Sequence, residues 1–266
     1  MLDPQLIEAL GDELFAALRE RRTLAPLTSR HPAIDLDDAY RISLRFLARR
    51  EAIGEQVIGK KIGVTSKAVQ DMLNVHQPDF GFLTQAMQVD DGSAVSLAEH
   101  RLIQPRAEGE IAFILAEDLN GPGVTASDVA GAPATASVAC CFEIVDSRID
   151  DWKIRIQDTV ADNASCGVFA LGETRIDPQQ LDLAACELQM FKNGQPAGRG
   201  LGAAVQGHPY EAVAWLANTL GRLGIPFRKG EVILSGALAP LVPVGPGDRI
   251  HMTISGIGAA SLRFVD

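Results

Sequence analysis

The sequence predicts an α+β fold in which helices come first and strands follow. In the first fifty residues, apolar side chains recur at three- and four-residue steps, which is typical of amphipathic helices. From Val57 onward, short β-branched segments bounded by glycine and proline are typical of strands. Because the strands arrive in runs with only one long helix among them, we expect a mixed or antiparallel β body rather than alternating βαβ units.

Two helices are expected in the N-terminal region. The first runs from about Pro4 to Arg21, and the second begins at Asp35 or Asp37, either of which can accept a capping hydrogen bond. We therefore predict a mainly helical N-terminal lobe over residues 1–75. A β-rich domain, expected to carry the chemistry, follows over residues 76–266.

The strand region has clear boundaries. The segment VIGKKIGV at 57–64 is a predicted strand, and Ser66 opens a short helix after it. One long helix is expected from about Tyr210 to Leu223, and Asn193-Gly194 predicts a tight hairpin turn. Further strands are expected over residues 110–115, 138–145, 167–171, 186–192, 232–235, 249–255 and 260–265.

Charge and hydropathy exclude several classes of protein. The chain has 24 basic and 34 acidic residues, and its net charge of −10 has the wrong sign for a protein that follows a phosphate backbone. No apolar run reaches the roughly 18 residues that a membrane span requires. The N-terminal segment lacks the basic and apolar regions of a signal peptide. We expect a cytoplasmic protein without a nucleic-acid or membrane partner.

Two acidic residues stand at alternate positions of a predicted strand. Glu108 and Glu110 point to the same face if the segment is extended, while Gly109 leaves the opposite side open. An exposed edge strand, on which paired acids are harmless, is the alternative. The apolar sequence that follows favours a strand that enters a core.

A third acid, Glu143, is the only charge in the apolar run 138–145. An isolated carboxylate in a protein interior costs several kcal/mol unless a cation or strong donors compensate it. A buried ion pair, with Arg148 as the nearby cation, is one interpretation. Together with the acid pair described above, however, Glu143 would complete a three-carboxylate site for Mg²⁺ or Mn²⁺.

Two further groups are candidates for proton transfer or substrate binding. Lys60 and Lys61 point to opposite faces of their strand, and Lys61 shares its face with two glycines that permit close approach of a ligand. A solvated edge lysine is the alternative. Asp79 lies in a constrained loop, where burial would raise its pKa toward an acid–base role. Simple turn formation is the alternative for this aspartate.

Five longer segments of the chain form a recognisable pattern. They are GKKIGVTSKAVQDMLNVHQPDFGFL, QPRAEGEIAFIL, FEIVDSRIDDWKIRIQDTVADNASCG, GEVILSGALAPLVPVGPGDRI and SGIGAASLRF. Together they resemble the hydratase/decarboxylase branch of the fumarylacetoacetate hydrolase superfamily. The resemblance extends from about residue 35 to the end of the chain, and it implies a mixed β-roll core and assembly as a homo-oligomer.

The resemblance also implies a set of site residues. Glu108, Glu110 and Glu143 would bind the Mg²⁺ or Mn²⁺. Lys61 and Asp79 would be the catalytic side chains, with the division of labour between them open. Substrate contacts are implied for Ser165, Ser235, Gly236 and Leu238.

The implied activity is that of a lyase. The resemblance implies metal-dependent hydration of 2-hydroxypenta-2,4-dienoate (2-oxopent-4-enoate) to 4-hydroxy-2-oxopentanoate in aromatic meta-cleavage catabolism. Two alternatives stay open: decarboxylation of 4-oxalocrotonate (2-oxo-3-hexenedioate), and a non-catalytic partner subunit of such an enzyme. A complex with a pathway decarboxylase is a further expectation.

Overall fold

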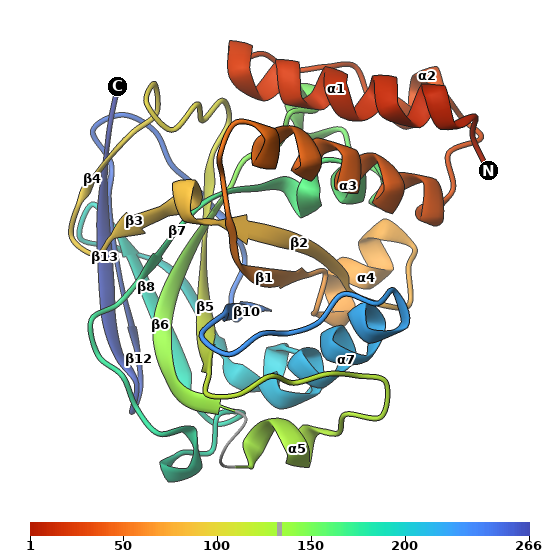
Figure 1. The fold of residues 1–266 in the computed structure, drawn as a ribbon. Helices are drawn as coiled ribbons and strands as arrows, with labels where there is room; N and C mark the ends of the chain where they lie inside the picture. Colours follow the sequence, from red (N-terminus) through yellow and green to blue (C-terminus); the bar gives the residue numbers. More distant parts are fainter. Residues whose placement is uncertain (132–134) are drawn as a thin grey trace.

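Two β-sheets and two groups of helices build the fold in a computed structural model that describes residues 1–131 and 135–266 (Figure 1). The predicted α+β class is confirmed. The α-helices are α1 (Pro4–Glu20), α2 (Leu27–Arg30), α3 (Leu36–Ala52), α4 (Lys67–Leu73), α5 (Ala126–Ala130), α6 (Ile156–Ala161) and α7 (Pro209–Arg222). Short 3-10 turns are η1 (Gln85–Met87), η2 (Asp150–Trp152), η3 (Asn163–Ser165), η4 (Pro178–Gln180) and η5 (Gly202–Ala204).

The strands form a mixed larger sheet and a smaller one. The larger sheet has the order β2-β1-β10-β5-β6-β7-β3, with β11 paired to β5, and the smaller has the order β4-β13-β12-β8-β9. In the larger sheet, β1 pairs with β10 and β3 with β7 in parallel. The strands are β1 (Val57–Gly63), β2 (Asp79–Thr84), β3 (Gln88–Asp90), β4 (Ala94–Ser96), β5 (Arg106–Leu115), β6 (Thr135–Val145), β7 (Cys166–Leu171), β8 (Glu187–Lys192), β9 (Gln195–Leu201), β10 (Val232–Ala237), β11 (Val242–Pro243), β12 (Arg249–Ile254) and β13 (Gly258–Val265).

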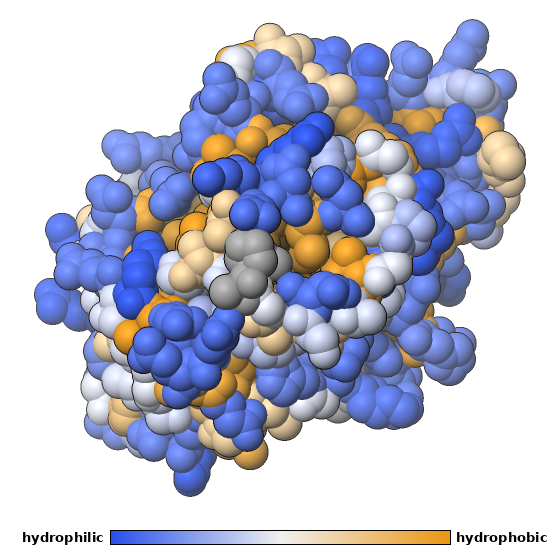
Figure 2. Space-filling model, turned by 60° about the horizontal axis from the view of Figure 1, so that its bottom comes forward, coloured by the Kyte–Doolittle hydropathy of each residue, from blue (hydrophilic) through white to orange (hydrophobic). Residues whose placement is uncertain are grey.

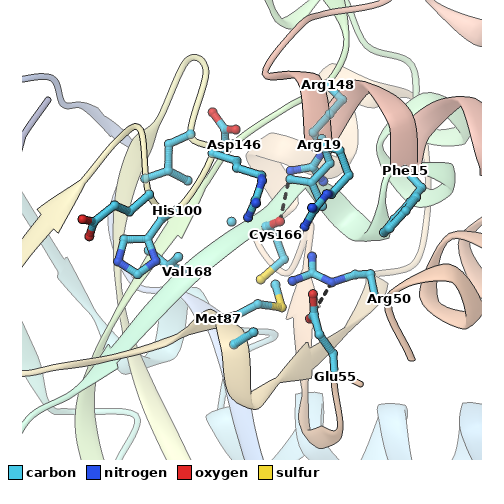
Figure 3. A pocket seen from close by; sticks show the side chains of 16 residues that line it. Phe15, Arg19, Arg50, Glu55, Met87, His100, Asp146, Arg148, Cys166 and Val168 are labelled. Atoms are coloured by element: carbon cyan, nitrogen blue, oxygen red, sulfur yellow. Dashed lines mark hydrogen bonds and ion pairs between the residues drawn. The ribbon is translucent and has the colours of Figure 1, made fainter. Parts of the chain in front are cut away.

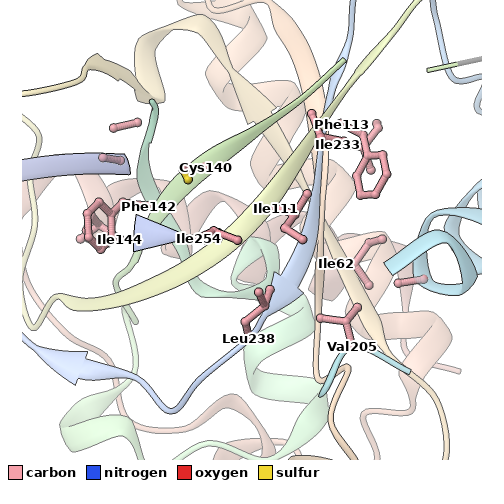
Figure 4. Packing of buried hydrophobic residues seen from close by; sticks show 14 of the residues in the cluster. Ile62, Ile111, Phe113, Cys140, Phe142, Ile144, Val205, Ile233, Leu238 and Ile254 are labelled. Atoms are coloured by element: carbon pink, nitrogen blue, oxygen red, sulfur yellow. The ribbon is translucent and has the colours of Figure 1, made fainter. Parts of the chain in front are cut away.

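The long strand β5 separates an apolar core from a polar face. A Cβ atom on Gly109 would lie 2.4 Å from Leu188 Cδ1 and 2.9 Å from Met252 Sδ, so the smaller sheet packs directly on the bare backbone. The side of Gly109 opposite the glutamates, predicted to be open, is therefore filled by the smaller sheet. Figure 4 shows Ile111 on β5 among the buried side chains of this core. Because strand side chains alternate, Glu108 and Glu110 point away from it.

The N-terminal helices pack as a separate layer beside β1 and β2 (Figure 1). Asp3 caps α1 by accepting a hydrogen bond from the Gln5 amide at 2.7 Å, and Asp35 caps α3 by accepting from the Asp38 amide at 2.8 Å. Of the two predicted caps for the second helix, Asp35 is therefore the one used. The apolar faces of α1 and α3 form their own buried cluster with α6, around Phe46.

Most predicted elements are found, with one correction that concerns the site. The helix opened by Ser66, the hairpin turn at Asn193-Gly194 and the long helix α7 are confirmed. Asp79, expected in a loop, is instead the first residue of β2, where it pairs with Gly63. Every residue of β2 is buried, so the strand has no polar–apolar alternation that would have revealed it. The division of the chain between residues 75 and 76 stays a prediction.

Hydrophilic residues, drawn in blue, cover much of the molecular face in Figure 2, with hydrophobic residues in orange between them. The large hydrophobic side chains that are exposed lie on α3, at the end of β9 and in loops, rather than on one element. The exposed large hydrophobic residues of the described chain are Met1, Leu44, Ile53, Leu201, Leu223 and Leu241.

A buried ion pair fixes a strained turn next to the polar face. Arg148 and Asp162 are both fully buried, and Arg148 Nε donates to Asp162 Oδ1 at 2.6 Å. The guanidinium also donates to the carbonyl oxygens of Asp162 and Cys166. Directly after Asp162, the turn η3 has φ values of 56°, 50° and 54°, a left-handed run in residues other than glycine. Such conformations cost about 1–3 kcal/mol each and persist only where neighbouring contacts enforce them.

A second contact ties the same turn to β2. Asn163 Oδ1 accepts a hydrogen bond from the Phe82 amide at 2.8 Å, and Asn163 Nδ2 donates to the Phe82 carbonyl at 3.0 Å. Gly81 beside it allows the approach, because a Cβ there would lie 2.5 Å from the Asn163 carbonyl oxygen. The turn is thus held from two sides.

The substitution Asp162→Asn should lower the free energy of unfolding by about 3–5 kcal/mol, because it leaves the Arg148 charge buried without a carboxylate. Urea denaturation followed by circular dichroism measures this. The control is Arg228→Ala in the exposed Arg228–Asp118 pair, whose side chains are 62% and 41% exposed. There the expected loss is about 1 kcal/mol or less. Equal losses in the two variants would contradict the assigned role of the buried pair.

Candidate active site

Three glutamates from two neighbouring strands form a buried cluster. Glu108 on β5 and Glu143 on β6 are direct cross-strand partners, and Glu110 follows on the same face of β5. One carboxylate oxygen from each of the three lies within 4.8 Å of the others. Glu110 and Glu143 are fully buried, whereas Glu108 is partly exposed. The structure therefore brings together the three residues that were predicted as metal ligands.

The cluster is electrostatically unfavourable without a cation. Burial, reinforced by the charge of Glu143, raises the pKa of Glu108 to about 7 and that of Glu110 well above its ordinary value. Glu110 Oε2 accepts a hydrogen bond from the Gly236 amide at 2.8 Å. Within the described part of the chain, Glu110 Oε1 and both carboxylate oxygens of Glu143 accept none. Free, buried carboxylate oxygens are the ligands that a hard divalent cation prefers, so the donor set fits Mg²⁺ or Mn²⁺.

Lys61 contributes a positive charge at the edge of this cluster. Its Nζ lies 3.2 Å from Glu143 Oε1 and donates to the Ala164 carbonyl at 3.0 Å. Burial lowers the pKa of Lys61, but the negative charges of Glu143 and its neighbours outweigh burial and raise it overall. Lys60 projects from the opposite face of β1 and pairs with Glu231 instead. Alternation along one strand thus gives the two adjacent lysines different partners.

Asp79 lies next to Lys61 across a bare stretch of backbone. A Cβ atom on Gly63 would lie 2.2 Å from Asp79 Oδ1 and 3.3 Å from Lys61 Nζ, so only glycine lets both groups approach here. Burial raises the pKa of Asp79 to about 6, although the charge of Lys61 acts to lower it. Among the residues with described positions, none donates a hydrogen bond to either carboxylate oxygen of Asp79. The carboxyl is therefore free to exchange a proton near neutral pH.

The predicted substrate contact Ser165 closes the strained turn η3. Its Oγ lies 3.1 Å from Thr159 Oγ1, and its carbonyl accepts a hydrogen bond from the Asp146 amide. The middle residue of the turn, Ala164, supplies the carbonyl that accepts from Lys61. Ser165 thus lies within one residue of the site.

The other predicted substrate contacts follow one another on β10 and just after it. Gly236 adopts a φ of 102°, and its amide binds Glu110. Ser235 Oγ donates to the Gly236 carbonyl at 3.1 Å and lies next to the same cluster. Leu238 is buried in the apolar core rather than at the polar face (Figure 4). The roles of all three as substrate contacts stay predictions.

Several neighbours of the site are not predicted from the sequence. Thr65 closes over Gly236, where an added Cβ would lie 2.4 Å from Thr65 Oγ1. Tyr40 stacks on Phe80 beside Asp79, with ring centroids 4.3 Å apart. Neither residue carries a local sequence signal, because both reach the site only through tertiary packing.

The ion pair proposed for Glu143 and Arg148 is wrong. Arg148 binds Asp162, and Glu143 faces Lys61. The sequence around Asp162, which includes the segment NASC, is rich in polar residues. That pattern does not identify Asp162 as the partner of Arg148. Arg148 therefore stabilises the turn η3 and does not pair with the glutamate cluster.

Comparison with known proteins shows the family to which the chain belongs. Residues 51–265 match the family model described as fumarylacetoacetate (FAA) hydrolase C-terminal. The chain belongs to this family. It is 68% identical over 266 residues to a 2-hydroxyhexa-2,4-dienoate hydratase of Comamonas testosteroni, with complete coverage of both chains. It is 62% identical over 224 residues, 84% of this chain and 100% of the relative, to a 2-hydroxypent-2,4-dienoate hydratase of Pseudomonas putida.

A solved structure of an FAA hydrolase relative has nearly the same fold. The 4-oxalocrotonate decarboxylase from Pseudomonas putida G7, complexed with magnesium and adipate, superposes with a TM-score of 0.95 at 34% identity. The superposition covers 100% of this chain and 99% of that one. The observed fold is therefore one that supports a magnesium complex in a relative.

A separate polar cavity of about 70 Å³ lies between the N-terminal helices and β7 (Figure 3). Arg50, held by Glu55, and Arg148, which donates to the Cys166 carbonyl, project toward it. None of the three cluster glutamates lines it within the portion of the chain that is described. This FAA hydrolase family protein therefore has its candidate chemistry at the glutamate cluster and not in the arginine-lined cavity.

Within the described residues, the helices are too short or too polar to cross a bilayer.

Saturating Mg²⁺ or Mn²⁺ should raise the melting temperature of the wild-type protein on the order of 5–10 °C at a hundredfold excess over Kd. Glu110→Gln should abolish this rise. Because the variant removes one of three mutually repelling acids, its metal-free form should melt at or above the metal-free wild type. Differential scanning calorimetry measures both. Glu117→Gln, at an exposed position just after β5, is the matched control; a full metal response in Glu110→Gln would refute the site.

Proposed function

We propose that the protein is a metal-dependent hydro-lyase that hydrates 2-hydroxypenta-2,4-dienoate to 4-hydroxy-2-oxopentanoate. The observation that carries the proposal is the placement of a proton-exchanging carboxyl and a fixed ammonium beside a three-glutamate cluster. The names of the relatives, which are hydratases of 2-hydroxy-2,4-dienoates, support the same activity. Hydration consumes only water and substrate, so no redox cofactor is required.

The glutamate cluster would hold Mg²⁺ or Mn²⁺ at the carboxylate end of the substrate. A bound divalent cation supplies Lewis acidity toward a 2-oxygen that lies beside a carboxylate. Glu108 is the partly exposed member, so it marks the side from which a ligand approaches. Glu110 and Glu143 are buried behind it and fix the position of the charge.

Lys61 and Asp79 have different roles in the proposed reaction. Lys61 keeps its proton, because the neighbouring acids raise its pKa, and its ammonium donates a hydrogen bond to the substrate's 2-oxygen. Asp79, with a pKa of about 6, exchanges protons at neutral pH. It gives a proton to C5 and then accepts one from the water that adds to C4. The proton from the 2-hydroxyl is balanced by the proton gained at C3.

The substitution Lys61→Ala should lower kcat by about 10²–10⁴-fold, because a positioned acid–base or donor group typically contributes that much. Lys60→Ala is the matched control, since the neighbouring lysine faces Glu231 on the other side of β1. Its kcat, corrected for folded protein by circular dichroism, should stay close to wild type. Loss of the dienol absorbance in the presence of Mn²⁺ measures both. Unchanged turnover in Lys61→Ala would remove this residue from the mechanism.

Decarboxylation of 4-oxalocrotonate is the second candidate, favoured by the superposition on a decarboxylase. Incubation of the protein and Mn²⁺ with each substrate separates the two activities. Hydration removes dienol absorbance without gas release, whereas decarboxylation releases CO₂. A protein that neither binds divalent metal nor turns over either substrate would support the non-catalytic partner subunit.

The finer expectations remain predictions. These are the preference between Mg²⁺ and Mn²⁺, assembly as a homo-oligomer, a complex with a pathway decarboxylase, a cytoplasmic location and a place in aromatic meta-cleavage catabolism. The roles of Ser165, Ser235, Gly236 and Leu238 as substrate contacts belong with them.

A further inference from the structure

A pocket of about 280 Å³ borders Asp79 on its helical side. Its apolar lining is drawn from separate elements and consists of Leu36 and Tyr40 on α3, Val75 and Pro78 before β2, and Ile156 on α6. His76 and Gln77 complete the lining at exposed positions. In the part of the chain with described positions, the lining includes no lysine or arginine. The pocket therefore offers apolar contact but no fixed positive charge.

Tyr40 connects this pocket to the catalytic carboxyl. Its ring stacks on Phe80, the residue after Asp79, with an interplanar angle of 11°. Burial, together with the negative charge of Asp79, raises the pKa of Tyr40, as expected for a hydroxyl close to that carboxylate. Tyr40 thus forms part of the pocket wall at the point where Asp79 meets it.

The glutamate cluster, Lys61, Asp79 and the apolar pocket lie in that order in space. Glu143 of the glutamate cluster contacts Lys61, Lys61 and Asp79 share the bare backbone of Gly63, and Asp79 borders the apolar pocket. In the proposed reaction, C1 and C2 of the substrate lie at the cluster, while C4 and C5 lie at Asp79. Any atoms beyond C5 must therefore extend past Asp79.

We propose that this pocket receives the end of the substrate beyond C5 and selects 2-hydroxy-2,4-dienoates with a hydrogen or a short alkyl group there. A chain that ends in a carboxylate would bring a second negative charge next to Asp79, and the described residues that line the pocket include no lysine or arginine to pair it, which is costly in an apolar setting. Space is not limiting, because one water-sized group occupies about 30 Å³. The inference rests on the proposed function and names its substrate class.

Two walls of the pocket lie outside the region that the family model matches. That match begins at residue 51, whereas Leu36 and Tyr40 come from earlier in α3. The N-terminal helices therefore do more than cover the sheet. They supply the side chains that decide which substrate end is accepted.

The test compares kcat/KM of the wild-type protein with Mg²⁺ on three substrates. These are 2-hydroxypenta-2,4-dienoate, 2-hydroxyhexa-2,4-dienoate and the dicarboxylate 2-hydroxyhexa-2,4-dienedioate. We expect the first two to agree within about tenfold and the dicarboxylate to be at least about 100-fold worse, since an unpaired buried charge is rejected far more strongly than an added methyl group. Comparable values for the C6 alkyl and dicarboxylate substrates would overturn the proposal.

Variants test the pocket itself. Leu36→Arg places a cation at the wall and should shift the ratio of kcat/KM, dicarboxylate over C6 alkyl, at least about tenfold toward the dicarboxylate, mainly through KM. Ile156→Ala removes apolar wall surface without adding charge and should lower the preference for the C6 over the C5 substrate, because the added methyl group loses a contact. Leu44→Arg, at a 39% exposed position of the same helix, is the matched control and should leave both ratios unchanged.

The outcomes separate this inference from the proposed function. An active wild-type enzyme whose ratios do not respond to Leu36→Arg or Ile156→Ala would overturn the pocket assignment alone. A folded wild-type protein that hydrates no dienoate would overturn the proposed function and the pocket assignment with it.

Discussion

Three carboxylates buried side by side repel one another, and the architecture around them depends on how that repulsion is offset. The ammonium of Lys61, 3.2 Å from Glu143, offsets one negative charge of the cluster. The raised pKa values of Glu108 and Glu110 show that the remainder is uncompensated by the protein. Proteins keep such groups ionised by coordinating a metal. The cluster thus destabilises the metal-free protein, and a bound divalent cation would remove this repulsion.

The position of the ammonium depends in turn on a strained segment. The Ala164 carbonyl that accepts from Lys61 belongs to a left-handed run of residues other than glycine. Arg148, through Asp162, holds one end of this run, and Asn163 clasps the backbone of Phe82 on the other side. Energy stored in the turn is therefore balanced by a buried ion pair and a pair of hydrogen bonds. Conformational strain of this kind is concentrated at functional sites.

Local periodicity predicted the parts of the site that lie on single strands. Alternation alone places Glu108 with Glu110 and separates Lys61 from Lys60, and both arrangements are found. Local periodicity does not predict contacts between distant parts of the chain. The partner of Arg148 is set by a turn, and the sheet that packs on Gly109 comes from much later in the sequence. The strand that begins with Asp79 was missed because burial on both faces removes the period-two signal. The helical N-terminus was predicted, but the stacking of its Tyr40 on Phe80, beside Asp79, was not.

The most direct test of the account is an anomalous difference map from crystals grown with Mn²⁺, recorded at the manganese absorption edge. We expect one strong peak coordinated by the carboxylates of Glu108, Glu110 and Glu143, at oxygen distances of about 2.0–2.3 Å. A map without a peak there, with these side chains turned into solvent or onto an arginine, would contradict it.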